Sequence, residues 1–157
     1  MTTRIHPALL VIICIAIPLV VGIVSSLLTR NAMVAFETMK KPPLAPPGWL
    51  FPVAWTILYV LMGLASYFII TSNTGNVKLA IVIYAVQLAF NFFWSLFFFN
   101  GKMYTFSFIW LLAMLVMVII LIVLSAKISK AAMFMLIPYA AWCTFAAYLN
   151  LGIGILN

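Results

Sequence analysis

The sequence predicts an all-α integral membrane protein, built as a bundle of five transmembrane helices. Composition is the first observation, because 68% of the 157 residues are hydrophobic and only 6% are charged. Soluble domains contain about 25% charged residues, so a chain this apolar needs lipid as its solvent. The second observation is a series of five apolar runs, each near the roughly 20 residues that cross a bilayer.

These runs place the helices and together make one domain over residues 1–157. We expect spans at about 7–29, 49–71, 79–99, 104–126 and 131–151. The breaks after the second, third and fourth spans are short and polar, as is typical where a helix ends near water. Short connections make sequence neighbours antiparallel neighbours in space. Lys and Arg residues divide evenly between the two sides, so the sequence does not fix the orientation in the membrane.

The first connection, at about 30–48, differs from the others because it is long and has four prolines within residues 42–47. Proline cannot continue a helix and pushes the preceding residue toward extended backbone. Such a segment is stiff, whereas a flexible linker would use Gly and Ser. Long ordered loops often carry function. We therefore expect a lid over one end of the bundle, with a plain spacer as the alternative.

The third span has a polar face. Gln87, Asn91 and Ser95 follow one another at intervals of four residues, which places them on one side of a helix. Polar groups that face lipid are costly, so this face should look into the bundle or a cavity. The opposite face carries Ala85 and Ala89, whose small side chains allow close helix approach, either within the bundle or in a dimer.

Comparable faces occur on three other spans. They consist of small, polar and aromatic groups: Gly22, Ser25, Ser26 and Thr29 in the first span, Trp55 and Tyr59 in the second, and Pro138, Trp142, Ala146 and Asn150 in the fifth. In antiparallel helices these groups and Asn91–Trp94 share the half of the bilayer beneath the loop. An apolar, aromatic pocket with a few hydrogen-bonding groups suits a flat hydrophobic ligand. The fourth span has almost no polar face and should be structural.

Several kinds of site are not expected. No predicted span contains Asp, Glu, Lys or Arg, although proton-driven transporters usually need an ionisable group in the membrane. Glu37 and His6 are the only acid and the only histidine, and the two cysteines fit no metal-site spacing. We therefore expect no metal site and no ordinary acid–base hydrolysis. The cations form no stripe with aromatic residues, so we expect no nucleic-acid partner.

Three motifs carry a resemblance to a known family. They are KPPLAPPGWLFPVAWTILY at residues 41–59, NFFWS at residues 91–95, and PYAAW at residues 138–142 with YLN at 148–150. In this order and with five spans, they resemble the TspO/MBR family, the bacterial relatives of the mitochondrial translocator protein, over essentially the whole chain. The resemblance implies a multi-pass protein of the bacterial cell membrane that often forms homodimers. The Ala85 and Ala89 face is a candidate for that contact, with packing inside the bundle as the alternative.

The resemblance also implies a ligand and a site. Family members bind protoporphyrin IX and synthetic isoquinoline carboxamide or benzodiazepine-type ligands in a pocket under the first loop. Carried over by motif, the lining should include Pro46, Trp55, Tyr59, Asn91, Trp94, Trp142 and Ala146, and we add Ser26 and Phe36 from outside the motifs. No cofactor is required, since the porphyrin would be the ligand or substrate.

Activity is less sharply indicated by the resemblance. Some bacterial members promote light-dependent oxidative breakdown of protoporphyrin, which would make Trp55 and Trp142 the catalytic candidates. The chain departs from many members at Lys41, where they have Trp, so any porphyrin contact of that Trp would not carry over. Two other functions stay open: a facilitative transporter of tetrapyrroles or lipids, and a ligand-regulated interaction protein in stress signalling.

Overall fold

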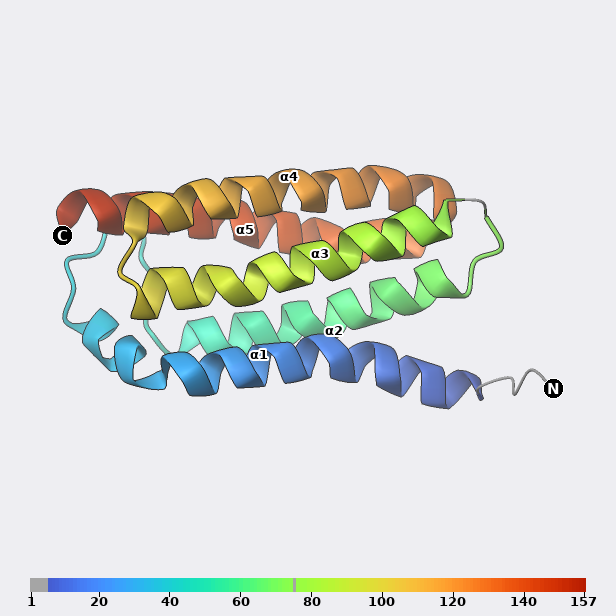
Figure 1. The fold of residues 1–157 in the computed structure, drawn as a ribbon, viewed down its shortest axis with the longest axis horizontal. Coiled ribbons are helices and arrows are strands. Elements are labelled where there is room, and N and C mark those ends of the chain that lie inside the picture. The colour runs from blue at the N-terminus through green and yellow to red at the C-terminus, as the bar shows by residue number, and fades with distance from the viewer. Residues whose placement is uncertain (1–5, 75) are drawn as a thin grey trace.

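The computed structural model describes residues 6–74 and 76–157, which form five long helices and no strand (Figure 1). The helices are α1 at Pro7–Glu37, α2 at Leu50–Ile70, α3 at Val77–Ser95, α4 at Tyr104–Ile128 and α5 at Lys130–Leu156. A π-helical turn, η1 at Leu96–Asn100, continues α3. Each of the five is long and apolar enough to cross a membrane, which confirms the predicted fold class.

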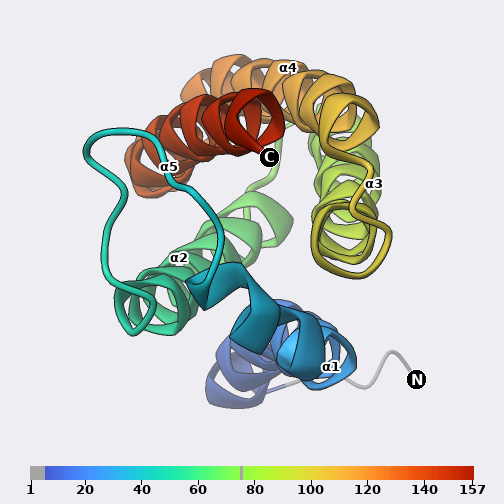
Figure 2. The ribbon, with the colours of Figure 1, turned by 90° about the vertical axis from the view of Figure 1, so that its left-hand side faces the viewer.

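The helices lie side by side along the long axis of the molecule and form a ring (Figures 1 and 2). Viewed from the end that carries the α1–α2 connection, the order is α1, α2, α5, α4, α3. This order corrects one expectation, because α2 packs mainly against α1 and α5 and touches α3 less. The short connection joins the ends of α2 and α3, and elsewhere the two helices meet through side chains that reach across the bundle.

The first helix is longer than predicted, because it ends at Glu37 and not near residue 29. Residues 30–37 contain no Gly or Pro, and the long side chain of Arg30 can reach the interface without ending the helix. At the actual end, the Thr38 hydroxyl donates a 2.8 Å hydrogen bond to the Ala35 carbonyl. The lid is therefore residues 38–49, shorter than the predicted 30–48.

The last helix also extends beyond its predicted end near residue 151, as far as Leu156. Gly152 lies within this extension and lets the lid approach the helix. A Cβ atom there would stand 2.6 Å from Pro42 Cβ, too close for two carbon atoms. The continuation of α5 past residue 151 therefore gives the lid a surface on which to pack.

The half of the bundle away from the lid is tightly packed. At Gly63, α1 and α2 touch backbone to backbone: a Cβ there would lie 2.5 Å from Ile15 Cα and 2.7 Å from the Cys14 carbonyl oxygen. Glycine lets two membrane helices approach in this way. The facing sides of α4 and α5 are filled there by fully buried side chains, including Val118, Leu121 and Leu136. The core of the fold thus lies away from the lid.

Candidate functional site

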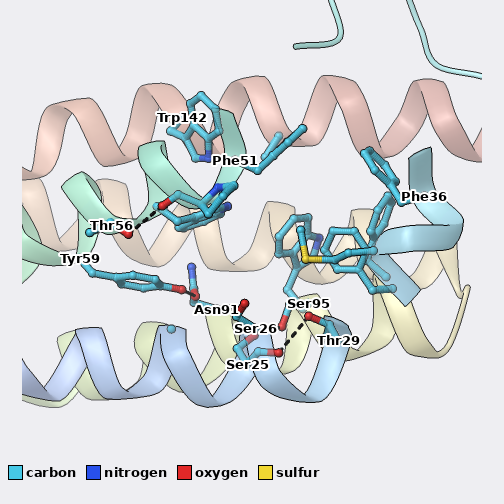
Figure 3. A pocket seen from close by; sticks show the side chains of 18 of the residues that line it. Ser25, Ser26, Thr29, Phe36, Phe51, Thr56, Tyr59, Asn91, Ser95 and Trp142 are labelled. Atoms are coloured by element: carbon cyan, nitrogen blue, oxygen red, sulfur yellow. Dashed lines mark hydrogen bonds between the residues drawn. The ribbon is translucent and has the colours of Figure 1, made fainter. Parts of the chain in front are cut away.

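A cavity of about 290 Å³ occupies the half of the bundle beneath the lid (Figure 3). Its walls come from α1, α2, α5 and the α3–η1 helix, and no described residue of α4 lines it. This agrees with the structural role expected for the fourth span. The helices that line the cavity are the four whose polar and aromatic faces the sequence singled out.

Eight of the nine residues predicted to form the pocket line this cavity: Ser26, Phe36, Trp55, Tyr59, Asn91, Trp94, Trp142 and Ala146. Pro46 does not line it, because it lies within the lid, partly buried and away from the cavity wall. Proline stiffens the lid at this point and does not contribute a surface to the cavity. The structure thus brings the predicted helical residues together around one cavity and leaves the loop residue outside its lining.

Aromatic rings make up much of the wall. The Trp55 ring stacks on Tyr59 one helical turn away, with centroids 5.6 Å apart and planes at 28°. It also meets Trp142 of α5 edge-on at 6.4 Å and lies 6.2 Å from Trp94 of α3. Rings in these arrangements stabilise one another beyond the area they bury. Trp55 is therefore the centre of a rigid surface built from three helices.

A chain of hydrogen bonds forms the deep end of the cavity. The Tyr59 hydroxyl donates to Asn91 Oδ1 at 2.7 Å, and Asn91 Nδ2 donates to the Tyr139 hydroxyl at 3.2 Å. Tyr139 in turn donates to Gln87 Oε1 at 2.8 Å. Asn91, Tyr139 and Gln87 are buried, where an unpaired polar group would be costly. The chain ties α2, α3 and α5 together and holds Tyr59 in place.

A second network fixes the wall nearer the lid. Trp94 Nε1 donates to Asn150 Oδ1 at 3.0 Å, and the Ser107 hydroxyl donates to the same oxygen at 3.1 Å. Across the cavity, the hydroxyls of Ser25 and Ser95 bond to each other and join α1 to α3. Asn91, Ser95 and Asn150 of the predicted polar faces are thus each bonded to other helices.

The indole of Trp142 behaves differently from that of Trp94. Figure 3 shows it extending from α5 toward the cavity, and its Nε1 is buried without a hydrogen-bond partner. A buried donor of this kind is destabilising until a partner arrives. No lining residue of the cavity is charged. The cavity can therefore take an uncharged, largely apolar body that offers at least one acceptor.

The cavity opens sideways between α1 and α2. Its exposed lining residues all belong to these two helices and include Ile23 and Leu27 of α1 and Pro52 and Thr56 of α2. The lining residues of α3 and α5 are buried or partly buried. In a membrane this opening faces the lipid, so a hydrophobic ligand can reach the cavity without crossing water.

Sequence reasoning missed some of the wall. Phe98 and Phe99 both line the cavity although they are adjacent in sequence. The π-helical turn at Leu96–Asn100 changes the angle between successive side chains, which an α-helical pattern cannot anticipate. Phe51 was also missed, but its spacing of four from Trp55 places it on the same helix face and could have identified it.

The described residues contain no group of three His, Cys, Asp or Glu side chains that could hold a metal ion. Cys14 and Cys143 are both free and buried on different helices. Neither lines the cavity. Among the described residues, the site thus offers aromatic surfaces and neutral hydrogen-bonding groups as its chemistry.

Comparison with known proteins agrees with this architecture. The family model described as "TspO/MBR family" matches residues 14–156. The chain is 34% identical over 148 residues to "Tryptophan-rich protein TspO" of Chlorobaculum tepidum, covering 92% of this chain and 94% of that protein. It is 36% identical over 118 residues to "Translocator protein" of Ovis aries, covering 73% and 70% of the two chains. The chain therefore belongs to the TspO/MBR family, as a multi-pass integral membrane protein.

Proposed function

We propose that this protein is a membrane receptor for tetrapyrroles such as protoporphyrin IX, and for related flat hydrophobic ligands. The observation that carries the proposal is the uncharged cavity walled by Trp55, Trp94 and Trp142. Planar aromatic ligands gain both apolar burial and ring stacking against such walls. The sideways opening suits a ligand that arrives from the bilayer, and family membership supports a role of this kind.

The ligand is expected to lie against Trp55 with its edge toward Trp142. The Nε1–H of Trp142 would then donate to an acceptor on the ligand, which would remove the cost of the unpaired donor. Tyr59 and Asn91 already bond to each other, so they serve as a fixed floor. The proposal therefore assigns stacking to Trp55 and directional recognition to Trp142.

The test is titration of protoporphyrin IX into purified protein, followed by the absorbance of the porphyrin. The double variant Trp55→Phe/Trp142→Phe should bind about tenfold more weakly, because two ring contacts and one donor are lost. The control is Trp49→Phe/Trp110→Phe. Trp49 is exposed and Trp110 packs on Phe90 outside the cavity. Equal affinity of the wild type and the first double variant would refute the site.

We propose further that Trp55 and Trp142 promote light-dependent oxidation of the bound porphyrin by dioxygen. The two indoles meet within the cavity at 6.4 Å, so both would contact the ligand. Illuminated protoporphyrin should decay faster with wild type than with the double variant at equal occupancy. Equal decay with the wild type and the double variant would show that the reaction is only photobleaching of free porphyrin.

A facilitative transporter of tetrapyrroles or lipids is the alternative. The packing away from the lid argues against transport, because the backbones of α1 and α2 touch at Gly63 and leave no passage between these two helices. Flux of porphyrin into proteoliposomes above that of protein-free liposomes would favour transport. The third function is that of a ligand-regulated partner in stress signalling. It would be tested by the stress response of cells that carry the double variant, and an intact response would count against it.

We also propose that two copies associate through α3. Ala85 and Ala89 lie exposed on one side of that helix, where small residues permit close contact. The variant Ala85→Phe/Ala89→Phe should shift the protein toward monomer in size-exclusion chromatography with light scattering. An unchanged mass would exclude this face as the contact.

A further inference from the structure

Lys41 lies beside the lid-end wall of the uncharged cavity, in contact with a lining residue although it is not itself part of the lining. The Lys41 ammonium nitrogen lies 4.8 Å from the centroid of the Phe36 ring. Phe36 is only 6% exposed, lines the cavity, and forms its wall at the lid end (Figure 3). Lys41 is itself partly buried. The positive charge is therefore placed against the cavity wall and is not a free surface charge.

The lid holds Lys41 in this position through the residues on both sides. The Lys40 N–H donates to Asn157 Oδ1 at 3.1 Å, and Asn157 Nδ2 donates to the Lys40 carbonyl at 2.8 Å. After Lys41, Pro42 packs on Gly152 and the Pro43 carbonyl accepts a 2.5 Å hydrogen bond from the Tyr148 hydroxyl. The backbone of Lys41 is thus fixed to α5 before any ligand arrives.

No carboxylate of the described residues neutralises this lysine. Glu37 is the only acidic residue of the chain, and its Oε1 is turned toward Gly48, 3.3 Å from where a Cβ would stand there. An aromatic face attracts an ammonium group but accepts none of its hydrogen bonds in the way that a carboxylate oxygen does. Lys41 therefore keeps donors available for an anionic group.

From this placement we propose that Lys41 binds a carboxylate of the ligand and selects amphipathic acids over neutral compounds. The inference rests on the proposed function, since it requires a flat apolar body in the cavity. A carboxylate deep in the cavity would lose its hydration without compensation. At the lid end it would meet Lys41 near the membrane surface. The ligand is thereby oriented with its acidic edge toward the lid and its apolar edge toward Tyr59.

The test compares protoporphyrin IX, which has two carboxylates, with its dimethyl ester, which has none, in a neutral detergent. Lys41→Met should weaken binding of the diacid about tenfold, the effect expected for a lost charge-assisted contact. It should leave binding of the ester within about twofold. Lys41→Arg should keep the preference for the diacid. Added salt should weaken binding of the diacid to wild type but not to Lys41→Met.

The matched control is Lys40→Met, which removes the same charge from the adjacent, exposed residue while the lid keeps its backbone bonds. Equal weakening of diacid binding by Lys40→Met would overturn the proposal in favour of a general electrostatic field. Equal loss of diacid and ester in Lys41→Met would overturn it in favour of a packing role through Phe36. If the wild type binds both porphyrins equally, the role of Lys41 is overturned while the assignment of the pocket stands. If the wild type binds neither porphyrin, the proposed function is refuted as well.

Discussion

Helices α1 and α2 meet in two different ways along their length. At Gly63 their backbones touch, whereas one turn nearer the lid the ring of Tyr59 lies between them and packs on Gly22. On the lid side of Tyr59, α1 and α2 no longer close the wall of the bundle, and the cavity opens between them. Both contacts depend on glycine, but one glycine meets rigid backbone and the other meets a side chain. The same helix pair thus provides a closed end for stability and an open end for binding.

The largest effect is expected at the closed end. In Gly63→Ala the new methyl group would meet Ile15 Cα and the Cys14 carbonyl, which cannot move without shifting α1. Overpacking of this kind costs roughly 1–3 kcal/mol. A thiol-reactive dye can follow thermal unfolding, because Cys14 and Cys143 are both free and buried. In Gly48→Ala the methyl group would meet only the end of the Glu37 side chain, so the melting temperature should stay nearly unchanged. Similar losses in both variants would contradict the backbone contact.

A somewhat smaller effect is expected from breaking the floor of the open end. Asn91→Leu would remove the acceptor of Tyr59 and the donor to Tyr139. Hydrogen bonds between membrane helices are worth roughly 0.6–1.7 kcal/mol each, so a loss of about 1–2 kcal/mol is expected. Chemical unfolding in detergent measures this loss. Thr144→Val provides the control, because Thr144 is exposed and bonds only to the Ala140 carbonyl of its own helix. An equal cost there would assign the effect to the loss of any side-chain hydrogen bond, and not to the link between helices.

Gly22→Ala makes the same chemical change as Gly63→Ala but at the open end. The methyl group would meet the Tyr59 ring, which can move toward the cavity. We expect a stability loss of about 1 kcal/mol or less, with a several-fold weaker affinity for protoporphyrin IX. Melting temperature and porphyrin titration separate the two effects. In a Tyr59→Leu background the same substitution should have little further effect on affinity, and a full effect there would exclude Tyr59 as the mediator.

The smallest effect on stability is expected from loosening the lid. Asn157→Ala with Tyr148→Phe removes the side-chain bonds that attach residues 40–43 to α5. These groups are exposed, so a stability loss below about 1 kcal/mol is expected. Hydrogen exchange of residues 38–49 should become faster, and bound porphyrin should be released sooner. Unchanged exchange in the lid would show that its prolines alone keep it ordered.

The sequence predicted the helices and eight of the residues that line the cavity, because a membrane restricts where polar groups can lie. Asn91 and Asn150 had to face inward, and in the structure each bonds to partners on other helices. The ends of α1 and α5 were harder to predict, because Arg30 and Gly152 resemble helix-ending residues but are accommodated by the interface and by the lid. Pro46 is not among the residues that line the cavity, because a motif does not show which way a loop residue faces.

The sequence by itself determined the five spans, the inward faces of α3 and α5, and the family. These follow from local composition, helical periodicity and motifs, none of which needs a neighbouring helix to be known. Only the tertiary structure decided the ring order of the helices, the bonding of Tyr59 to Asn91, and the position of Lys41 against Phe36. Periodicity shows which residues share a face but not what that face meets, because the partner is chosen by packing across the whole bundle.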